Sequence, residues 1–133
     1  MVESAYSKTK IQVRYNDLDT VGHVNNAIYF TYFEIGRIDF INKFLWKFKS
    51  DEINFVIARA EADFIKSILL YDVVYVRTWI SRVGNTSFDF SYRLEDEDGK
   101  EYATGKTINV ILSNGKPSPV PNEIKALLME NEN

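Results

Sequence analysis

The strongest constraint on the fold is a long apolar segment, residues 27–44, which contains no proline and only one glycine. Within it, Ile28, Tyr32 and Ile35 follow the spacing of an α-helix. Aromatic side chains widen the apolar surface well beyond one stripe: Tyr29, Phe30, Phe33, Phe40 and Phe44. Because a helix that is apolar on most sides must be buried on most sides, we expect the rest of the chain to wrap around it.

The segment after this helix supplies the predicted wrapping partner. Residues 55–66 alternate between two faces, as a half-buried strand does. One face carries Ala58, Ala60, Ala62 and Phe64, and the other carries Arg59, Glu61 and Asp63. We expect the alanines to let the backbone of this strand lie close to the helix. The acidic pair on the opposite face is expected to meet solvent, where such residues normally lie.

Three further segments rich in β-branched and aromatic residues are predicted as strands: residues 71–83, 87–95 and 102–112. The turn sequences Gly84-Asn85 and Asp98-Gly99 separate them, so they are expected to be antiparallel neighbours. A short strand is predicted at residues 10–15, before the long helix. A short helix is predicted at residues 122–129, after a loop that contains three prolines.

The predicted order of elements is therefore strand, long helix, four strands and short helix. Strands that are segregated from helices along the chain indicate the α+β class. The economical arrangement is a five-stranded antiparallel sheet around one long central helix, with a short C-terminal helix. No repeat, low-complexity tract or linker interrupts residues 1–133, so we expect a single domain.

Composition excludes several classes of function. Apolar residues make up 45% of the 133 residues, which is enough for a packed core. The net charge is −3 with both signs mixed along the chain, so the basic footprint of a nucleic-acid-binding protein is missing. The chain has no cysteine, no apolar signal segment and no run of about 18 apolar residues. We therefore expect a cytoplasmic protein with no membrane span.

The polar loop before the helix is the candidate functional site. Residues 17–26 place two carboxylates, the only histidine and two amides at the start of the predicted helix, and Asn25 or Asn26 is a suitable N-cap. A helix N-terminus carries unpaired N–H groups and partial positive charge. Such N–H groups can hold a developing oxyanion, and a neighbouring carboxylate can attack or deprotonate water. This grouping indicates a hydrolytic site.

The loop and the order of elements resemble the hotdog fold, and more narrowly the acyl-CoA thioesterases related to 4-hydroxybenzoyl-CoA thioesterase. The specific part of the resemblance is RYNDLD at residues 14–19, GHVNN at residues 22–26, and Tyr29. Weaker support comes from residues 82–87 and from the prolines of residues 117–121. The resemblance covers nearly the whole chain and implies the hotdog fold.

In that family the catalytic carboxylate matches Asp19, and the backbone N–H that polarises the thioester carbonyl matches Asn26. The loop is also similar to that of the plant acyl-carrier-protein thioesterases, in which an asparagine and a histidine follow the aspartate. The histidine matches His23, whereas Val21 stands at the asparagine position. The resemblance thus implies Asp19 as nucleophile or general base, Asn26 as oxyanion donor, and His23 as a catalytic or loop-orienting residue. Asp17 is expected to act as a structural cap.

The activity implied is hydrolysis of acyl-CoA thioesters to the free acid and coenzyme A, without a cofactor. Alternatives are hydrolysis of an acyl-carrier-protein thioester and a non-catalytic acyl-thioester binding module. The phosphates of coenzyme A would need basic side chains from different parts of the chain to bind them, and the candidates are Arg59, Lys66, Arg82 and Lys106. A metal site is not expected, because one histidine and no cysteine offer no ligand set. An open sheet edge and the family resemblance together imply a homodimer or homotetramer.

Overall fold

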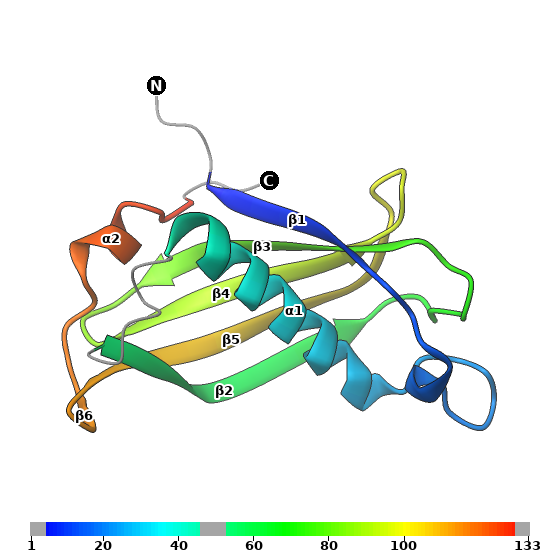
Figure 1. Cartoon of the computed structure of the whole chain (residues 1–133), viewed down its shortest axis with the longest axis horizontal. Helices are drawn as coiled ribbons and strands as arrows, with labels where there is room; N and C mark the ends of the chain where they lie inside the picture. The colour runs from blue at the N-terminus through cyan, green and yellow to red at the C-terminus, as the bar shows by residue number, and fades with distance from the viewer. Residues whose placement is uncertain (1–4, 46–52, 130–133) are drawn as a thin grey trace.

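The computed structural model describes residues 5–45 and 53–129 (Figure 1). In chain order its elements are β1 (Tyr6–Ile11), the 3₁₀ turn η1 (Tyr15–Asp17), α1 (Asn26–Phe44), β2 (Ile53–Phe64), β3 (Val74–Val83), β4 (Ser87–Glu95), β5 (Glu101–Ser113), β6 (Lys116–Pro117) and α2 (Asn122–Lys125). The predicted order of long elements is confirmed, and β6 is an addition to it. No helix in these two segments has the length and apolarity needed to cross a membrane.

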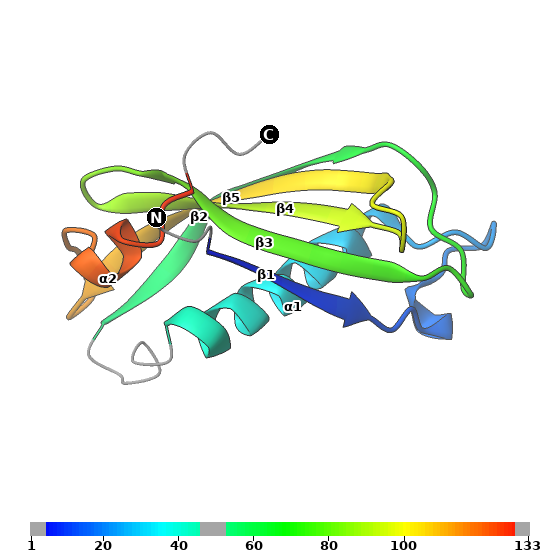
Figure 2. The ribbon, with the colours of Figure 1, turned by 90° about the horizontal axis from the view of Figure 1, so that it is seen from above.

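The strands form one antiparallel sheet in the order β1-β3-β4-β5-β2, and β6 pairs with the end of β5. Although β2 follows α1 directly in the chain, it lies at the edge opposite β1, so α1 crosses one face of the sheet (Figure 2). The neighbours β3, β4 and β5 are joined consecutively, as their short turns predict. One long helix against five long antiparallel strands, with a short C-terminal helix, confirms the predicted hotdog fold.

Two glycines set how closely α1 and the sheet approach. The helix contacts mainly β1 and β3. At Gly36 of α1, a Cβ atom would collide with the side chains of Thr78 and Val76 on β3. On β5, Gly105 leaves open the space that the ring of Phe33 occupies. The absence of a side chain at these two positions therefore permits the close packing of α1 on the sheet.

The expectation that the alanines of β2 would let its backbone lie close to α1 is wrong. Ala60 is exposed and Ala62 is only half-buried. A β-bulge lies between Ile57 and Arg59, which shifts the register of β2 against β5. Because β2 is an edge strand at the far side of the sheet from β1, most of it lies away from the helix.

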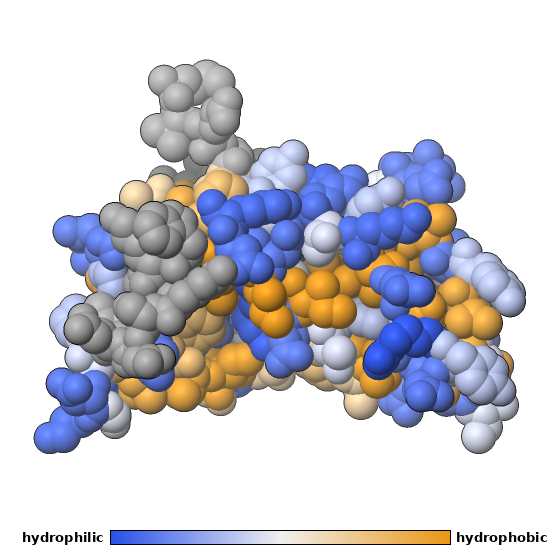
Figure 3. Space-filling model, in the orientation of Figure 1, coloured by the Kyte–Doolittle hydropathy of each residue, from blue (hydrophilic) through white to orange (hydrophobic). Residues whose placement is uncertain are grey.

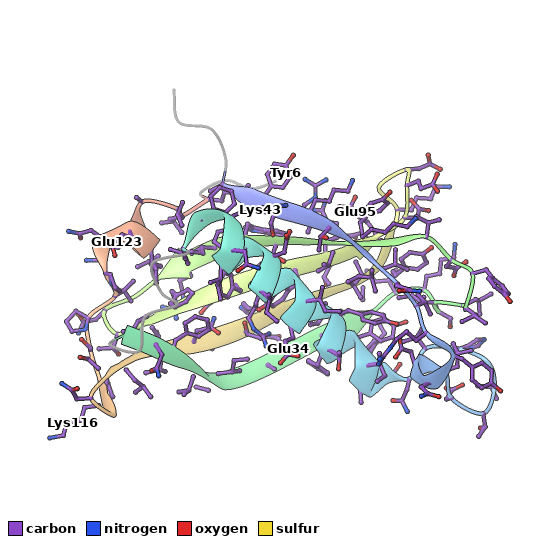
Figure 4. All side chains as sticks on the ribbon, viewed as in Figure 1. Tyr6, Glu34, Lys43, Glu95, Lys116 and Glu123 are labelled. Carbon is purple, nitrogen blue, oxygen red and sulfur yellow. The ribbon has the colours of Figure 1, made fainter. Side chains whose placement is uncertain are left out.

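An aromatic core fills the space between α1 and the sheet (Figure 4). Phe33 stacks on Tyr92 of β4 with ring centroids 4.7 Å apart and an interplanar angle of 14°. Farther along the helix, Phe40 packs edge-on against Phe90, with centroids 5.3 Å apart. These contacts fix α1 over the centre of the sheet and hence fix the position of its N-terminus.

One side of α1 is not covered within a single chain. Ile35 is 39% exposed and Ile38 is 54% exposed. The face of the molecule that carries α1 shows apolar surface among the polar side chains (Figure 3). The expected burial of the helix on most sides is therefore not reached by one chain alone, because the sheet covers only the face that carries Gly36 and Phe40.

Some predicted boundaries are also wrong. The strand predicted at residues 10–15 lies at Tyr6–Ile11 instead. Residues 12–14 form no regular element, and η1 begins at Tyr15, where Arg14 donates its backbone N–H to the side chain of Asp17 and closes a turn. The final helix ends at Lys125 rather than near Met129. Beyond the helix, Met129 donates its N–H to the carbonyl of Ile80 on β3 at 2.9 Å.

Candidate active site

The loop between β1 and α1 is fixed by one buried carboxylate, Asp17, which is 1% exposed. It accepts hydrogen bonds from the backbone N–H of Arg14 (3.0 Å), from the Arg14 guanidinium (3.2 Å) and from the Tyr32 hydroxyl (2.7 Å). The backbone carbonyl of Asp17 accepts the N–H of Asn25 at 2.9 Å. One residue therefore ties together the beginning of the loop, its end and the second turn of α1.

Burial by itself would raise the pKa of Asp17. The hydrogen bonds from Arg14 and Tyr32 and the positive charge of Arg14 outweigh burial, so the pKa lies below its ordinary value of 3.8. Asp17 is therefore ionised at neutral pH. Burial, followed by the bond to Asp17, raises the pKa of Tyr32, which keeps its hydroxyl protonated as the donor.

Asp19 lies at the exposed end of the same loop, in a turn that engages half of its carboxylate. Its Oδ1 accepts the backbone N–H groups of Val21 (2.9 Å) and His23 (3.2 Å). Its own N–H donates to the carbonyl of His23 at 2.8 Å, and Gly22 turns the chain with a φ of 83°. Among the residues that the structure describes, no hydrogen bond is made to Oδ2, so this oxygen remains available to a ligand.

The start of α1 leaves a second group available. Asn25 is the N-cap and its Oδ1 accepts the N–H of Ala27 at 2.9 Å. Asn26, the first helical residue, has a backbone N–H with no partner within residues 5–45 and 53–129. Such an N–H at a helix N-terminus is suited to bind an anionic or carbonyl oxygen.

A pocket of about 170 Å³ joins these groups. It is lined by Asp19, His23, Val24, Asn26, Tyr29, Phe64, Ile65, Lys66 and Ser67. All three residues singled out from the sequence, Asp19, His23 and Asn26, thus line one pocket. The segment after β2 reaches them because His23 forms a β-bridge with Leu69, and Val24 donates its N–H to Ile68 at 2.8 Å.

Other sequence candidates lie elsewhere. Glu61 and Asp63 line a separate pocket of about 260 Å³ with Lys106 on the sheet. Arg82 is engaged by Asp89 at 2.9 Å. Of the four proposed cations, Lys66 is the one that lines the pocket of Asp19. Within the described part of the chain, no group of three acidic or histidine side chains is placed to hold a metal ion.

The sequence did not assign the aromatic wall of this pocket to the site. Tyr29 is 2% exposed, and its ring meets Phe64 edge-on, with centroids 4.9 Å apart. Tyr29 follows Asn26 by three residues, so the helical spacing places it beneath the N-terminus. Phe64 comes from the far end of β2, and only the pairing of the two loops brings it there.

Comparison with known proteins identifies the family of this chain. The model of the Thioesterase-like superfamily matches residues 13–128. A predicted thioesterase from Bacillus stearothermophilus is 32% identical with a TM-score of 0.80, over 93% of this chain and 94% of that one. A thioesterase from Thermus thermophilus, complexed with coenzyme A and Zn, is 33% identical with a TM-score of 0.78, over 89% and 93%. An uncharacterized protein of Bacillus subtilis, YsmA, is 29% identical over 90% of this chain and 83% of its own length. The extent of the family match and the hotdog architecture together show that this chain belongs to the Thioesterase-like superfamily and is a thioester hydrolase.

Proposed function

We propose that the chain hydrolyses acyl thioesters of coenzyme A to the free acid and coenzyme A, with Asp19 and the backbone N–H of Asn26 as the principal reacting groups. One observation carries the proposal: a free carboxylate oxygen and a free helix N-terminal N–H belong to residues of the same pocket in the described part of the chain. The coenzyme A bound to the Thermus thermophilus relative supports the choice of carrier.

The two groups supply complementary parts of the reaction. The N–H of Asn26, at the positive end of α1, donates to the thioester carbonyl oxygen and stabilises the negative charge that develops on it. Asp19 then acts by one of two routes. As a nucleophile, its Oδ2 adds to the carbonyl carbon, the thiolate leaves, and water hydrolyses the resulting anhydride. As a general base, it takes a proton from water while the hydroxide adds, and the thiolate then leaves.

His23 supports this arrangement through its backbone. Its N–H donates to Asp19 Oδ1 and its carbonyl accepts the Asp19 N–H, so His23 holds both the side chain and the backbone of Asp19. In the described segments, no hydrogen bond or ion pair joins the imidazole to Asp19. We assign His23 the role of orienting the loop, with its side chain as one wall of the pocket.

The test is release of free thiol from aryl, short-chain, medium-chain and long-chain acyl-CoA by the purified chain. Asp19→Asn is expected to abolish turnover without changing the fold, because the amide neither attacks nor accepts a proton. Asp63→Asn is the matched control, since Asp63 is an exposed carboxylate outside this pocket. Full activity in Asp19→Asn would show that Asp19 is not the reacting carboxylate. Absence of thiol release from every acyl-CoA would refute the proposed carrier.

A further inference from the structure

Lys66 brings a positive charge to the pocket of Asp19. It lines this space of about 170 Å³ together with Asp19, Asn26 and Tyr29, and no other lysine or arginine of the described chain does so. Lys66 is exposed, and within residues 5–45 and 53–129 it forms no ion pair, in contrast to Lys43 and Lys106. Its charge is therefore available to a ligand of the pocket.

The strand β5 holds Lys66 beside the pocket. The N–H of Lys66 donates to the carbonyl of Tyr102 at 3.0 Å, and the N–H of Ile65 donates to the same carbonyl at 2.9 Å. The ammonium of Lys66 lies 5.7 Å from the centroid of the Tyr102 ring, which is 4% exposed. A cation at this distance from an aromatic face is attracted by the ring. Both the backbone and the charged end of Lys66 are thus tied to Tyr102.

Asp96, on the turn that follows β4, is not an ion-pair partner of Lys66. Its Oδ1 accepts the backbone N–H groups of Asp98 at 2.8 Å and Lys100 at 2.9 Å. The bond from Lys100 is the main cause that holds the pKa of Asp96 below its ordinary value, and the charge of Lys66 contributes least. Because the two charges affect each other only weakly, Lys66 remains able to pair with a ligand.

The size of the pocket decides which part of a substrate meets Lys66. A water molecule occupies about 30 Å³ of the liquid, so the pocket has room for about five waters. Asp19, Asn26 and Lys66 line this one small space, so a group that binds Lys66 lies close to the reacting carbonyl carbon. The phosphates of coenzyme A are separated from the thioester sulfur by a long amide-containing chain. A substituent of the acyl group, in contrast, lies near the carbonyl carbon.

Building on the proposed function, we propose that Lys66 makes the pocket selective for acyl groups that end in a carboxylate, the mono-thioesters of short dicarboxylic acids. The carboxylate of Asp19 repels such an acyl group, and the ammonium of Lys66 offsets this repulsion. Ser67 lines the same pocket and adds a hydroxyl donor, while the rings of Tyr29 and Phe64 form an apolar wall for the methylene groups. The products are the free dicarboxylic acid and coenzyme A.

The test compares two acyl-CoA substrates of equal size that differ in charge. Glutaryl-CoA ends in a carboxylate, and 5-methylhexanoyl-CoA has an isopropyl group in its place. Release of free thiol is measured for both, and the spontaneous release without protein is subtracted. We expect kcat/KM of the wild type to be about tenfold higher for glutaryl-CoA, the effect of one charge-assisted hydrogen bond. Equal values, or a preference for 5-methylhexanoyl-CoA, would overturn the proposal.

Variants of Lys66 show whether this residue causes the preference. Lys66→Met removes the charge but keeps an unbranched side chain, and it should lower kcat/KM for glutaryl-CoA about tenfold more than for 5-methylhexanoyl-CoA. Lys66→Arg should keep most of the preference. Lys8→Met is the matched control, because Lys8 is also an exposed lysine over a tyrosine ring, 4.9 Å from the centroid of Tyr75, and lies outside the pocket. An equal loss for both substrates in Lys66→Met would place Lys66 on the carrier and overturn the proposal.

A binding measurement separates this proposal from the proposed function. Two thioethers, S-(4-carboxybutyl)-coenzyme A and S-(5-methylhexyl)-coenzyme A, match the substrates but cannot be hydrolysed. Titration calorimetry should show that the wild type binds the carboxylate-bearing thioether about tenfold more tightly and that Lys66→Met loses this difference. Absence of the difference in the wild type, including no binding of either thioether, would overturn the proposal even if acyl-CoA is hydrolysed. The expected difference without hydrolysis of any acyl-CoA would instead contradict the proposed activity.

Discussion

Tyr32 on α1 donates a 2.7 Å hydrogen bond to the buried carboxylate of Asp17, fifteen residues earlier in the chain. This bond ties the loop to the helix whose N-terminus lies in the candidate site. Because Asp17 also binds Arg14 and Asn25, the same residue fixes where Asp19 stands relative to Asn26. The residue that builds the site is therefore different from the residue proposed to react.

Removing this bond tests its contribution to stability. Tyr32→Phe leaves the ring in place and deprives a buried, charged acceptor of one donor. We expect the free energy of unfolding to fall by about 1.5–3 kcal/mol, as for hydrogen bonds to charged groups. Urea denaturation measures it, and Tyr71→Phe is the control, because that hydroxyl lies on a 92% exposed side chain. Equal stability of the two variants would show that the bond contributes nothing.

The lowered pKa of Asp17 predicts a pH dependence of stability. In the unfolded chain the pKa returns to about its ordinary value of 3.8, so near that pH the unfolded state binds more protons than the folded state. The contribution of Asp17 is therefore fully present above this value and is lost as pH falls through the lower folded pKa. We expect the free energy of unfolding to decline more steeply for the wild type than for Asp17→Asn between about pH 5 and pH 2. Parallel curves would contradict this.

The role of the Asn26 backbone is testable by removing its N–H. Proline is tolerated at the first helical position, and Asn25 already has the extended conformation that precedes proline, with φ −60° and ψ 136°. Asn26→Pro should therefore keep the fold and lower kcat by about 10²–10³, the effect of losing one oxyanion donor. Asn26→Ala keeps the N–H and should remain active. Steady-state kinetics measures kcat of both variants, and circular dichroism checks that both are folded. Similar kcat values for the two variants would show that the N–H of Asn26 takes no part in the reaction.

At Gly36, replacement of glycine by alanine should destabilise the protein, although alanine normally stabilises a helix relative to glycine. In an exposed helix interior, alanine is favoured over glycine by about 1 kcal/mol. Here a Cβ atom would collide with Thr78 and Val76, and overpacking of a core costs about 1–3 kcal/mol. We expect Gly36→Ala to lower the thermal midpoint, whereas Thr31→Ala, at an exposed position of the same helix, should not. A more stable Gly36→Ala would mean that α1 shifts away from β3 at little cost.

The exposed apolar side of α1 predicts self-association. Ile35 and Ile38 are 39% and 54% exposed, and we expect a second copy of the chain to cover them. Light scattering should then give a homodimer or larger assembly at micromolar concentration. Ile38→Glu should shift it toward the monomer, because an unpaired charge is costly to bury. Lys116→Glu, in the exposed β6, is the control that introduces the same side chain elsewhere. A monomeric wild type would refute the expectation.

The sequence by itself determined the features that depend on neighbouring residues. The strand at 87–95 matches its predicted bounds, Asn25 caps α1 as one of two predicted candidates, and the loop candidates share a pocket. These outcomes follow from local dihedral preferences, side-chain periodicity and a separation of seven residues between Asp19 and Asn26. Periodicity failed for the alanines of β2, because it identifies the two faces of a strand without specifying what covers them.

Only the tertiary structure decided which distant segments meet. It placed β2 at the far edge of the sheet, and it brought Phe64 and Lys66 to the pocket of Asp19 through the bridge between His23 and Leu69. Such contacts depend on how all the core side chains pack together, including the close approach of β3 to Gly36. A short stretch of sequence cannot specify this packing, because the packing involves residues from every element.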